Sequence, residues 1–132
     1  TNTEIKKIFE QNGEPYFRAL EQNTADWLKL NVSSTIISTG GGFFKVHNLR
    51  DIGTIVYLKS SFDGIYERIL KHKNAKKKLK KRPLFQNIDE AKALYNVRVE
   101  SYKNLSHLEI DVENKSIEKI VKEIGDYFLL SN

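Results

Sequence analysis

The sequence predicts an α/β protein with a parallel β-sheet flanked by helices. Short apolar or β-branched runs at residues 34–39, 54–58 and 107–111 alternate with stretches that repeat apolar residues at helical spacing. Parallel strands need a crossover connection, usually a helix, so this alternation favours helices that cover a single sheet. A chain of 132 residues can bury one core, and we expect a single domain over residues 1–132.

Two consecutive helices are predicted before the first strand. Gly13 suits the C-terminal cap of a short helix, and a second helix opens at Glu14 and Pro15, because proline is tolerated in the first helical turn. In this second helix Arg18 follows Glu14 by four residues and precedes Glu21 by three, which places the three side chains on one face. The two carboxylates can therefore orient the arginine, either as a surface salt bridge or as part of a ligand site.

Three consecutive glycines follow the first predicted strand. Gly40, Gly41 and Gly42 would let backbone amides approach a ligand with no side chain in the way, although a tight turn alone would also use glycine. Ligands of open α/β sheets bind beside the carboxyl ends of the strands. The position of this segment, the glycine loop, therefore predicts a binding site.

The rest of the chain predicts further helices at residues 46–52, 60–71 and 88–103, and a last one that Ser116 opens. Asn87 can cap the helix over 88–103. The last helix has a regular apolar stripe that we expect to be buried, formed by Ile117, Ile120, Val121, Ile124 and Phe128.

Arg98 lies on the helix face that is expected to be buried. Helical spacing places it on one face with Ala91, Leu94, Tyr95 and Tyr102. A buried arginine costs free energy unless an anion pairs with it. Neither Glu90 nor Glu100 shares this face, so the partner is either an acid remote in sequence or a ligand.

The positive charge is concentrated in one segment. The net charge is +5, yet residues 68–82 contain nine basic and no acidic side chains. We predict that residues 71–86 form a mobile loop that serves as a basic lid. Within it the lysine run ends at Arg82-Pro83-Leu84, which delivers Arg82 to a phosphate. A solvated loop is the plain alternative. Nucleic acid is not expected as a partner, because no aromatic side chains interleave with the lysines.

Composition excludes several other classes of protein. The chain has no cysteine and three scattered histidines, so neither a disulfide nor a metal site built from these residues is expected. No run approaches the roughly 20 apolar residues of a membrane span, and a cytoplasmic location is expected. The chain starts at Thr1 and contains no methionine.

Taken in order, four motifs resemble those of shikimate kinases. They are Gly-Glu-x-x-Phe-Arg-x-x-Glu at residues 13–21, Ser-Thr-Gly-Gly-Gly at 38–42, Arg-Pro-Leu at 82–84, and Arg-x-x-x-Tyr at 98–102. The resemblance implies the three-layer architecture of P-loop nucleoside-monophosphate kinases. It also implies transfer of the ATP γ-phosphoryl group to the 3-hydroxyl of shikimate, assisted by Mg²⁺, in the biosynthesis of chorismate and aromatic amino acids.

The resemblance also implies roles for individual residues. Arg18 and Arg98 would hold the shikimate carboxylate, Glu21 would support Arg18, and Gly40, Gly41 and Gly42 would line the substrate. Arg82 would contact ATP and act in catalysis by stabilising charge during transfer. The loop over residues 111–116 would hold adenine, with Lys115 as a candidate ATP contact.

One part of the family pattern is not found in the sequence. Shikimate kinases begin with a strand, a Gly-x-x-Gly-x-Gly-Lys-[Ser/Thr] phosphate loop, a helix, and a second strand with Asp-x-Asp. The Mg²⁺ ligands are expected in this N-terminal segment. We therefore expect that the sequence is the C-terminal portion of such a kinase and that these 132 residues alone are inactive. The alternatives are another small-molecule P-loop kinase, such as one acting on gluconate, or a remnant that binds ligand without catalysis.

Overall fold

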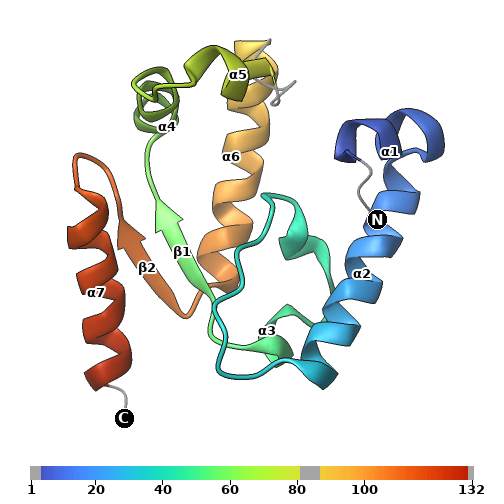
Figure 1. The fold of residues 1–132 in the computed structure, drawn as a ribbon, viewed down its shortest axis with the longest axis horizontal. Coiled ribbons are helices and arrows are strands. Elements are labelled where there is room, and N and C mark those ends of the chain that lie inside the picture. The colour runs from blue at the N-terminus through green and yellow to red at the C-terminus, as the bar shows by residue number, and fades with distance from the viewer. Residues whose placement is uncertain (1–3, 81–86, 131–132) are drawn as a thin grey trace. The chain divides into compact units, whose positions relative to one another are not determined.

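The structure is a computed structural model that describes residues 4–80 and 87–130. The chain divides into two compact units, Thr1–Thr54 and Ile55–Asn132 (Figure 1). Within the described residues, no helix combines the length and apolar character that a membrane span requires.

The first unit is helical. It contains α1 (Ile5–Asn12), α2 (Glu14–Asn31), the 3-10 turn η1 (Phe43–Lys45) and the short helix α3 (Leu49–Ile52). Gly13 separates α1 from α2 with a φ of 83°, a value that favours glycine, and Pro15 lies in the first turn of α2. Both predicted helix boundaries are confirmed.

The core of the first unit joins α2 to the segment that follows the glycine loop. Ala25 of α2 is fully buried, and Phe43 and Val46 are buried against it. Three partly buried side chains complete the cluster, namely Leu28, Leu49 and Ile52. Alanine at this point lets the chain after the glycine loop approach the helix closely.

The strand predicted over residues 34–39 is not found. This segment has no regular secondary structure, and Ile36 is 97% exposed. In the described part of the chain, the sheet consists of two strands that pair only with each other. A strand depends on backbone hydrogen bonds to a neighbour, and β-branched composition does not supply one.

The second unit is α/β, as predicted. It contains β1 (Val56–Lys59), α4 (Phe62–Leu70), α5 (Ala75–Lys80), α6 (Ile88–Leu105), β2 (Leu108–Asp111) and α7 (Ile117–Leu130). The two strands are parallel, with Val56 opposite Leu108 and Lys59 opposite Asp111. Figure 1 shows the strands between α6 and α7. This arrangement is a small parallel sheet with crossover helices, consistent with a P-loop-kinase-like α/β fold.

Side-chain caps mark the starts of three helices in this unit. The Asn87 side chain accepts a hydrogen bond from the Glu90 N–H at 3.2 Å, and Ser116 accepts one from Lys119 at 3.2 Å, as predicted. Ser61 caps α4 by accepting from Gly64 at 3.0 Å.

The basic segment differs from its prediction. Residues 75–80 form the helix α5, so the expectation of a loop is wrong for this stretch. Lysine is a good helix former, and no glycine or proline interrupts these six residues. Arg82, predicted to act from this segment, lies outside the described residues.

The predicted stripe of α7 is only partly buried. Ile120 is 8% exposed and Ile124 is half-buried, but Ile117, Val121 and Phe128 are exposed. The stripe is wider than the surface that the short strand β2 offers, so only its centre is covered within this unit.

Candidate functional site

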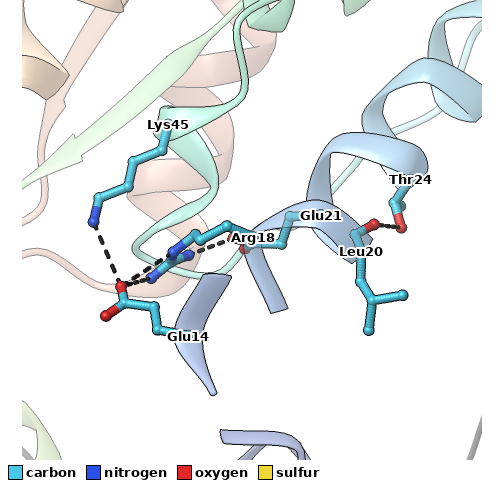
Figure 2. Close-up of polar contacts among 6 residues, drawn as sticks. All are labelled: Glu14, Arg18, Leu20, Glu21, Thr24 and Lys45. Atoms are coloured by element: carbon cyan, nitrogen blue, oxygen red, sulfur yellow. Dashed lines mark hydrogen bonds and ion pairs between the residues drawn. The ribbon is translucent and has the colours of Figure 1, made fainter. Parts of the chain in front are cut away.

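Arg18 of α2 lies between two acidic side chains, as its spacing predicted. Its Nε and Nη2 both donate to Glu14 Oε1 at 3.3 Å, and its Nη1 donates to Glu21 Oε1 (Figure 2). Lys45 Nζ lies 3.7 Å from the same Glu14 oxygen. The Arg18 guanidinium also lies over the Phe17 ring, with Cζ 5.5 Å from the ring centroid.

The two acids differ in exposure. The side chain of Glu21 is 12% exposed, whereas that of Glu14 is 53% exposed and holds Arg18 through longer contacts. An anionic ligand could therefore replace Glu14 at the guanidinium more easily than it could replace Glu21. The arrangement fits Glu21 as the support and Glu14 as the exchangeable partner.

The glycine loop meets Arg18 at Gly42. A Cβ on Gly42 would lie 2.7 Å from Arg18 Nη2 and 2.9 Å from Cζ, which is closer than atoms can approach. At Gly40 the corresponding position is open, with no atom within 4 Å. Two features that the sequence singled out separately are therefore brought together, and Gly42 leaves the space that the guanidinium occupies.

A cavity of about 290 Å³ lies beside this contact. Its lining comes from α2 and from the segment that leads into η1, and it includes Glu21, Ser38, Thr39 and Gly40 together with apolar side chains. The Thr24 hydroxyl, also in the lining, donates to the Leu20 carbonyl of its own helix at 2.8 Å (Figure 2). The site thus offers a mainly apolar hollow whose lining includes Glu21, the acid that binds Arg18.

Arg98 belongs to the second unit and lies on the inner face of α6, as predicted. Ala91 is buried on the same face, and Tyr95 and Tyr102 are half-buried there. Burial raises the pKa of the Tyr102 hydroxyl, and the charge and hydrogen bond of Arg98 partly oppose this rise. Among the described residues, Arg98 Nε is a buried donor without a hydrogen-bond partner. A buried donor of this kind can be satisfied by a water molecule, an ion or a ligand.

Comparison with known proteins decides the family. The shikimate kinase family model matches residues 1–128. This chain belongs to the shikimate kinase family. The shikimate kinase of Flavobacterium johnsoniae is 38% identical over 137 residues, which cover 95% of this chain and 75% of that protein. The shikimate kinase of Helicobacter hepaticus is 35% identical, covering 92% of this chain and 74% of that protein, and the one of Streptococcus thermophilus is 37% identical, covering 91% and 75%.

Members of the shikimate kinase family are ATP-dependent kinases, and hence transferases. The matches support this activity over the gluconate-kinase-like alternative. Family membership also implies the use of ATP and Mg²⁺.

The loop predicted to hold adenine is hydrogen-bonded to α4 and to its N-cap residue, Ser61. Arg68 Nη2 donates to the carbonyls of Val112 and Lys115, at 2.8 and 3.3 Å. Glu113 accepts hydrogen bonds from the hydroxyl and the N–H of Ser61, at 2.6 and 3.2 Å. Lys115 Nζ donates to both Glu123 oxygens at 3.1 Å, so its ammonium is engaged with α7. An ATP contact by Lys115 would require this ion pair to open.

The described residues do not supply a cluster of ligands for Mg²⁺. They contain no group of three or more histidine, cysteine or acidic side chains that could hold a metal ion. The Mg²⁺ that the family implies therefore has no site formed by the described side chains alone.

Two side chains at the Arg18 site had no role predicted from the sequence. The Phe17 ring lies against the guanidinium, and its place next to the arginine was a usable signal. Lys45 reaches Glu14 from η1. Nothing in the spacing of Lys45 pointed to Glu14, which lies 31 residues earlier in the chain.

Proposed function

We propose that this protein transfers the γ-phosphoryl group of ATP to the 3-hydroxyl of shikimate and that Arg18 binds the shikimate carboxylate. The observation that carries the proposal is the contact of Arg18 with the glycine loop at Gly42. A guanidinium recognises a carboxylate through two parallel hydrogen bonds, and the adjoining cavity offers apolar walls for a six-membered ring.

Arg18 can exchange one carboxylate for another when the substrate binds. In the structure it is neutralised by Glu14 and Glu21, and Lys45 adds a second positive charge beside Glu14. Release of the exposed Glu14 would free Nε and Nη2 for the substrate and leave Glu14 paired with Lys45. Glu21 would keep Nη1 fixed throughout.

Arg98 is proposed as a second carboxylate contact. Its buried Nε–H group has no hydrogen-bond partner among the described residues, and an anionic ligand could accept a hydrogen bond from it. The hydrogen bond to Tyr102 would hold the rest of the guanidinium in place. Gly40 and Gly41 are proposed to line the substrate, because their backbone can approach it without side chains.

The ATP side of the reaction rests on the family. Arg82 is proposed to contact the phosphates and to stabilise charge as the bond between the γ-phosphorus and the bridging oxygen breaks and the bond to the shikimate oxygen forms. The shikimate hydroxyl loses its proton in this step, and the proton is released to solvent. Lys115 and the loop over 111–116 are proposed to lie near adenine, and residues 71–86 are proposed to form the lid. The protein is proposed to be a cytoplasmic monomer.

The test is an Arg18→Lys substitution in the full-length protein, with shikimate-dependent ADP release as the measurement. Lysine keeps the charge but cannot form two parallel hydrogen bonds, so we expect the KM for shikimate to rise about 10- to 100-fold, which corresponds to roughly 1.5–3 kcal/mol for a charge-assisted hydrogen bond. The KM for ATP should change little. A wild-type protein that neither binds nor phosphorylates shikimate would refute the proposal, and turnover of gluconate instead would favour the alternative kinase class.

A further inference from the structure

A buried polar residue lies close to the Arg18 site but takes no direct part in it. Asn48 is 6% exposed, and its side-chain amide is satisfied by two residues of α2. Its Oδ1 accepts a hydrogen bond from Gln22 Nε2 at 3.0 Å, and its Nδ2 donates to Asp26 Oδ1 at 3.0 Å. Gln22 Nε2 also donates to Asp26 Oδ1 at 3.0 Å, which closes a triangle of three side chains.

The neighbouring backbone is held by the same helix. The His47 N–H donates to Gln22 Oε1 at 3.1 Å, so Gln22 binds the chain at two consecutive residues. Asn48 precedes α3, where asparagine commonly caps the following helix, yet its side chain makes no cap. The amide of Asn48 is committed to α2 instead.

This triangle lies next to the contact between Arg18 and Gly42. Gln22 follows Arg18 by four residues, which is one helical turn on the same face of α2. On the other side, Asn48 follows Gly42 by six residues, and the buried side chains of Phe43 and Val46 lie between them. The polar triangle and the core around Ala25 therefore both fix how far the glycine loop lies from α2.

We propose that Asn48, with Gln22 and Asp26, is a positioning residue that sets the distance between Arg18 and the glycine loop. The inference rests on the proposed function, because it assigns the triangle to the shikimate side of the reaction. None of the three side chains is proposed to touch substrate. Hydrogen-bonded groups behind a binding residue commonly decide how well that residue is held.

The donor and acceptor pattern of the triangle allows a sharp test. An Asn48→Asp substitution keeps the shape but places a second carboxylate against Asp26, where a donor is needed. The two acidic groups repel each other, and the chain at residue 48 should move away from α2. Adding Asp26→Asn restores one amide and one carboxylate in reversed order, so the D26N/N48D pair can rebuild the hydrogen bond.

The experiment compares wild type, N48D, D26N/N48D and N23D in the full-length protein. Asn23 is an exposed residue of α2, so N23D is the same chemical change away from the triangle. Shikimate binding is measured by calorimetry, and the KM values for shikimate and ATP are measured by ADP release at a temperature where all variants are folded. We expect N48D to weaken shikimate binding and raise its KM about tenfold, with the KM for ATP within about twofold of wild type.

The rescue decides between positioning and simple loss of structure. D26N/N48D should return the KM for shikimate to within about threefold of wild type, since the interaction is rebuilt. Should N48D fail to fold, Gln22→Met, which removes the amide and keeps the length, is expected to show the same selective effect.

Two results would overturn the inference while leaving the proposed function intact. One is wild-type shikimate affinity in folded N48D or Q22M, and the other is an equal rise in both KM values that D26N/N48D does not reverse. Wild-type protein that does not bind shikimate would overturn the proposed function and the inference together.

Discussion

At the scale of single residues, the site depends on a missing side chain as much as on those present. Gly42 has a φ of −98°, which any residue can adopt, so its role is not a matter of backbone conformation. It leaves room for the Arg18 guanidinium, whose Cζ lies only 2.9 Å from the position that a Cβ would take. The pairing of Arg18 with Glu14 and Glu21 follows from helical spacing, but the approach of Gly42, 24 residues later, does not.

A Gly42→Ala substitution should therefore impair binding without unfolding the protein. The new methyl group would meet the end of a flexible side chain, so Arg18 would move and the backbone would stay. We expect the KM for shikimate to rise about tenfold, while the free energy of unfolding changes by less than about 0.5 kcal/mol. Gly53→Ala is the matched control, because its Cβ position has no atom within 4 Å. Unchanged shikimate affinity in G42A would contradict this prediction, because Arg18 could then bind shikimate from another position.

At the scale of elements, α2 is held to the segment after the glycine loop by close packing. Ala25 has no exposed surface, and Phe43 and Val46 contact it. Lys29 and Asp51 add an ion pair at 3.7 Å, but both side chains are largely exposed, so this pair contributes little. The distance between the two segments is therefore set by the size of residue 25 and by the Asn48 triangle.

Enlarging residue 25 should destabilise the first unit. Ala25→Leu adds three carbon atoms where there is no space, and overpacking of this kind costs about 1–3 kcal/mol. Urea unfolding followed by the fluorescence of Trp27, which belongs to the same helix, would measure the loss. Ala19→Leu on the exposed face of α2 should leave the unfolding midpoint nearly unchanged. Equal midpoints for A25L and A19L would contradict the packing described here.

The sheet of the second unit packs on α6 through tyrosine rings. The ring centroids of Tyr57 and Tyr102 are 5.3 Å apart, and Tyr57 is buried. Burial raises the pKa of the Tyr57 hydroxyl above its ordinary value of 10.0, and the nearby Tyr95, Glu109 and Tyr102 raise it further. The folded state therefore keeps a proton that the unfolded chain releases.

This shift in the pKa of Tyr57 predicts a loss of stability in base. Its contribution to the free energy of unfolding is fully present below pH 10.0 and falls as the pH rises through the higher native pKa. Unfolding in urea between about pH 8 and pH 11 should show a steeper loss for wild type than for Tyr57→Phe, which has no proton to release. Tyr16→Phe, at a side chain that is 48% exposed, serves as the control. Parallel curves for wild type and Y57F would disprove the prediction.

At the scale of the whole molecule, the positive charge is placed in one segment. Residues 68–82 hold nine of the 22 basic side chains, and the remainder has more acidic than basic residues. A local basic region raises the concentration of a polyanion such as ATP near it and does so most at low ionic strength. The helix α5 carries four of these lysines, Lys76, Lys77, Lys78 and Lys80.

Neutralising the lysines of α5 should weaken ATP binding and make the KM for ATP less dependent on salt concentration. We expect a K76Q/K77Q/K78Q/K80Q variant to raise the KM for ATP about three- to tenfold at low ionic strength, and to flatten its rise with added salt. The KM for shikimate should be unaffected. The control neutralises four lysines outside the segment, Lys7, Lys103, Lys119 and Lys122. The same change in both variants would mean that only net charge matters.

The sequence by itself determined the features that depend on neighbours along the chain. Local spacing predicts the helix caps at Asn87 and Ser116, the turn at Gly13, the acids beside Arg18 and the inward face of Arg98. The four motifs, taken in order, identified the family. Only the tertiary structure decided the contacts between distant segments. Which surfaces meet determines the missing strand at residues 34–39, the half-covered stripe of α7 and the Asn48 triangle. Strand pairing and side-chain burial depend on segments elsewhere in the chain, and the composition of one segment does not show which other segments will contact it.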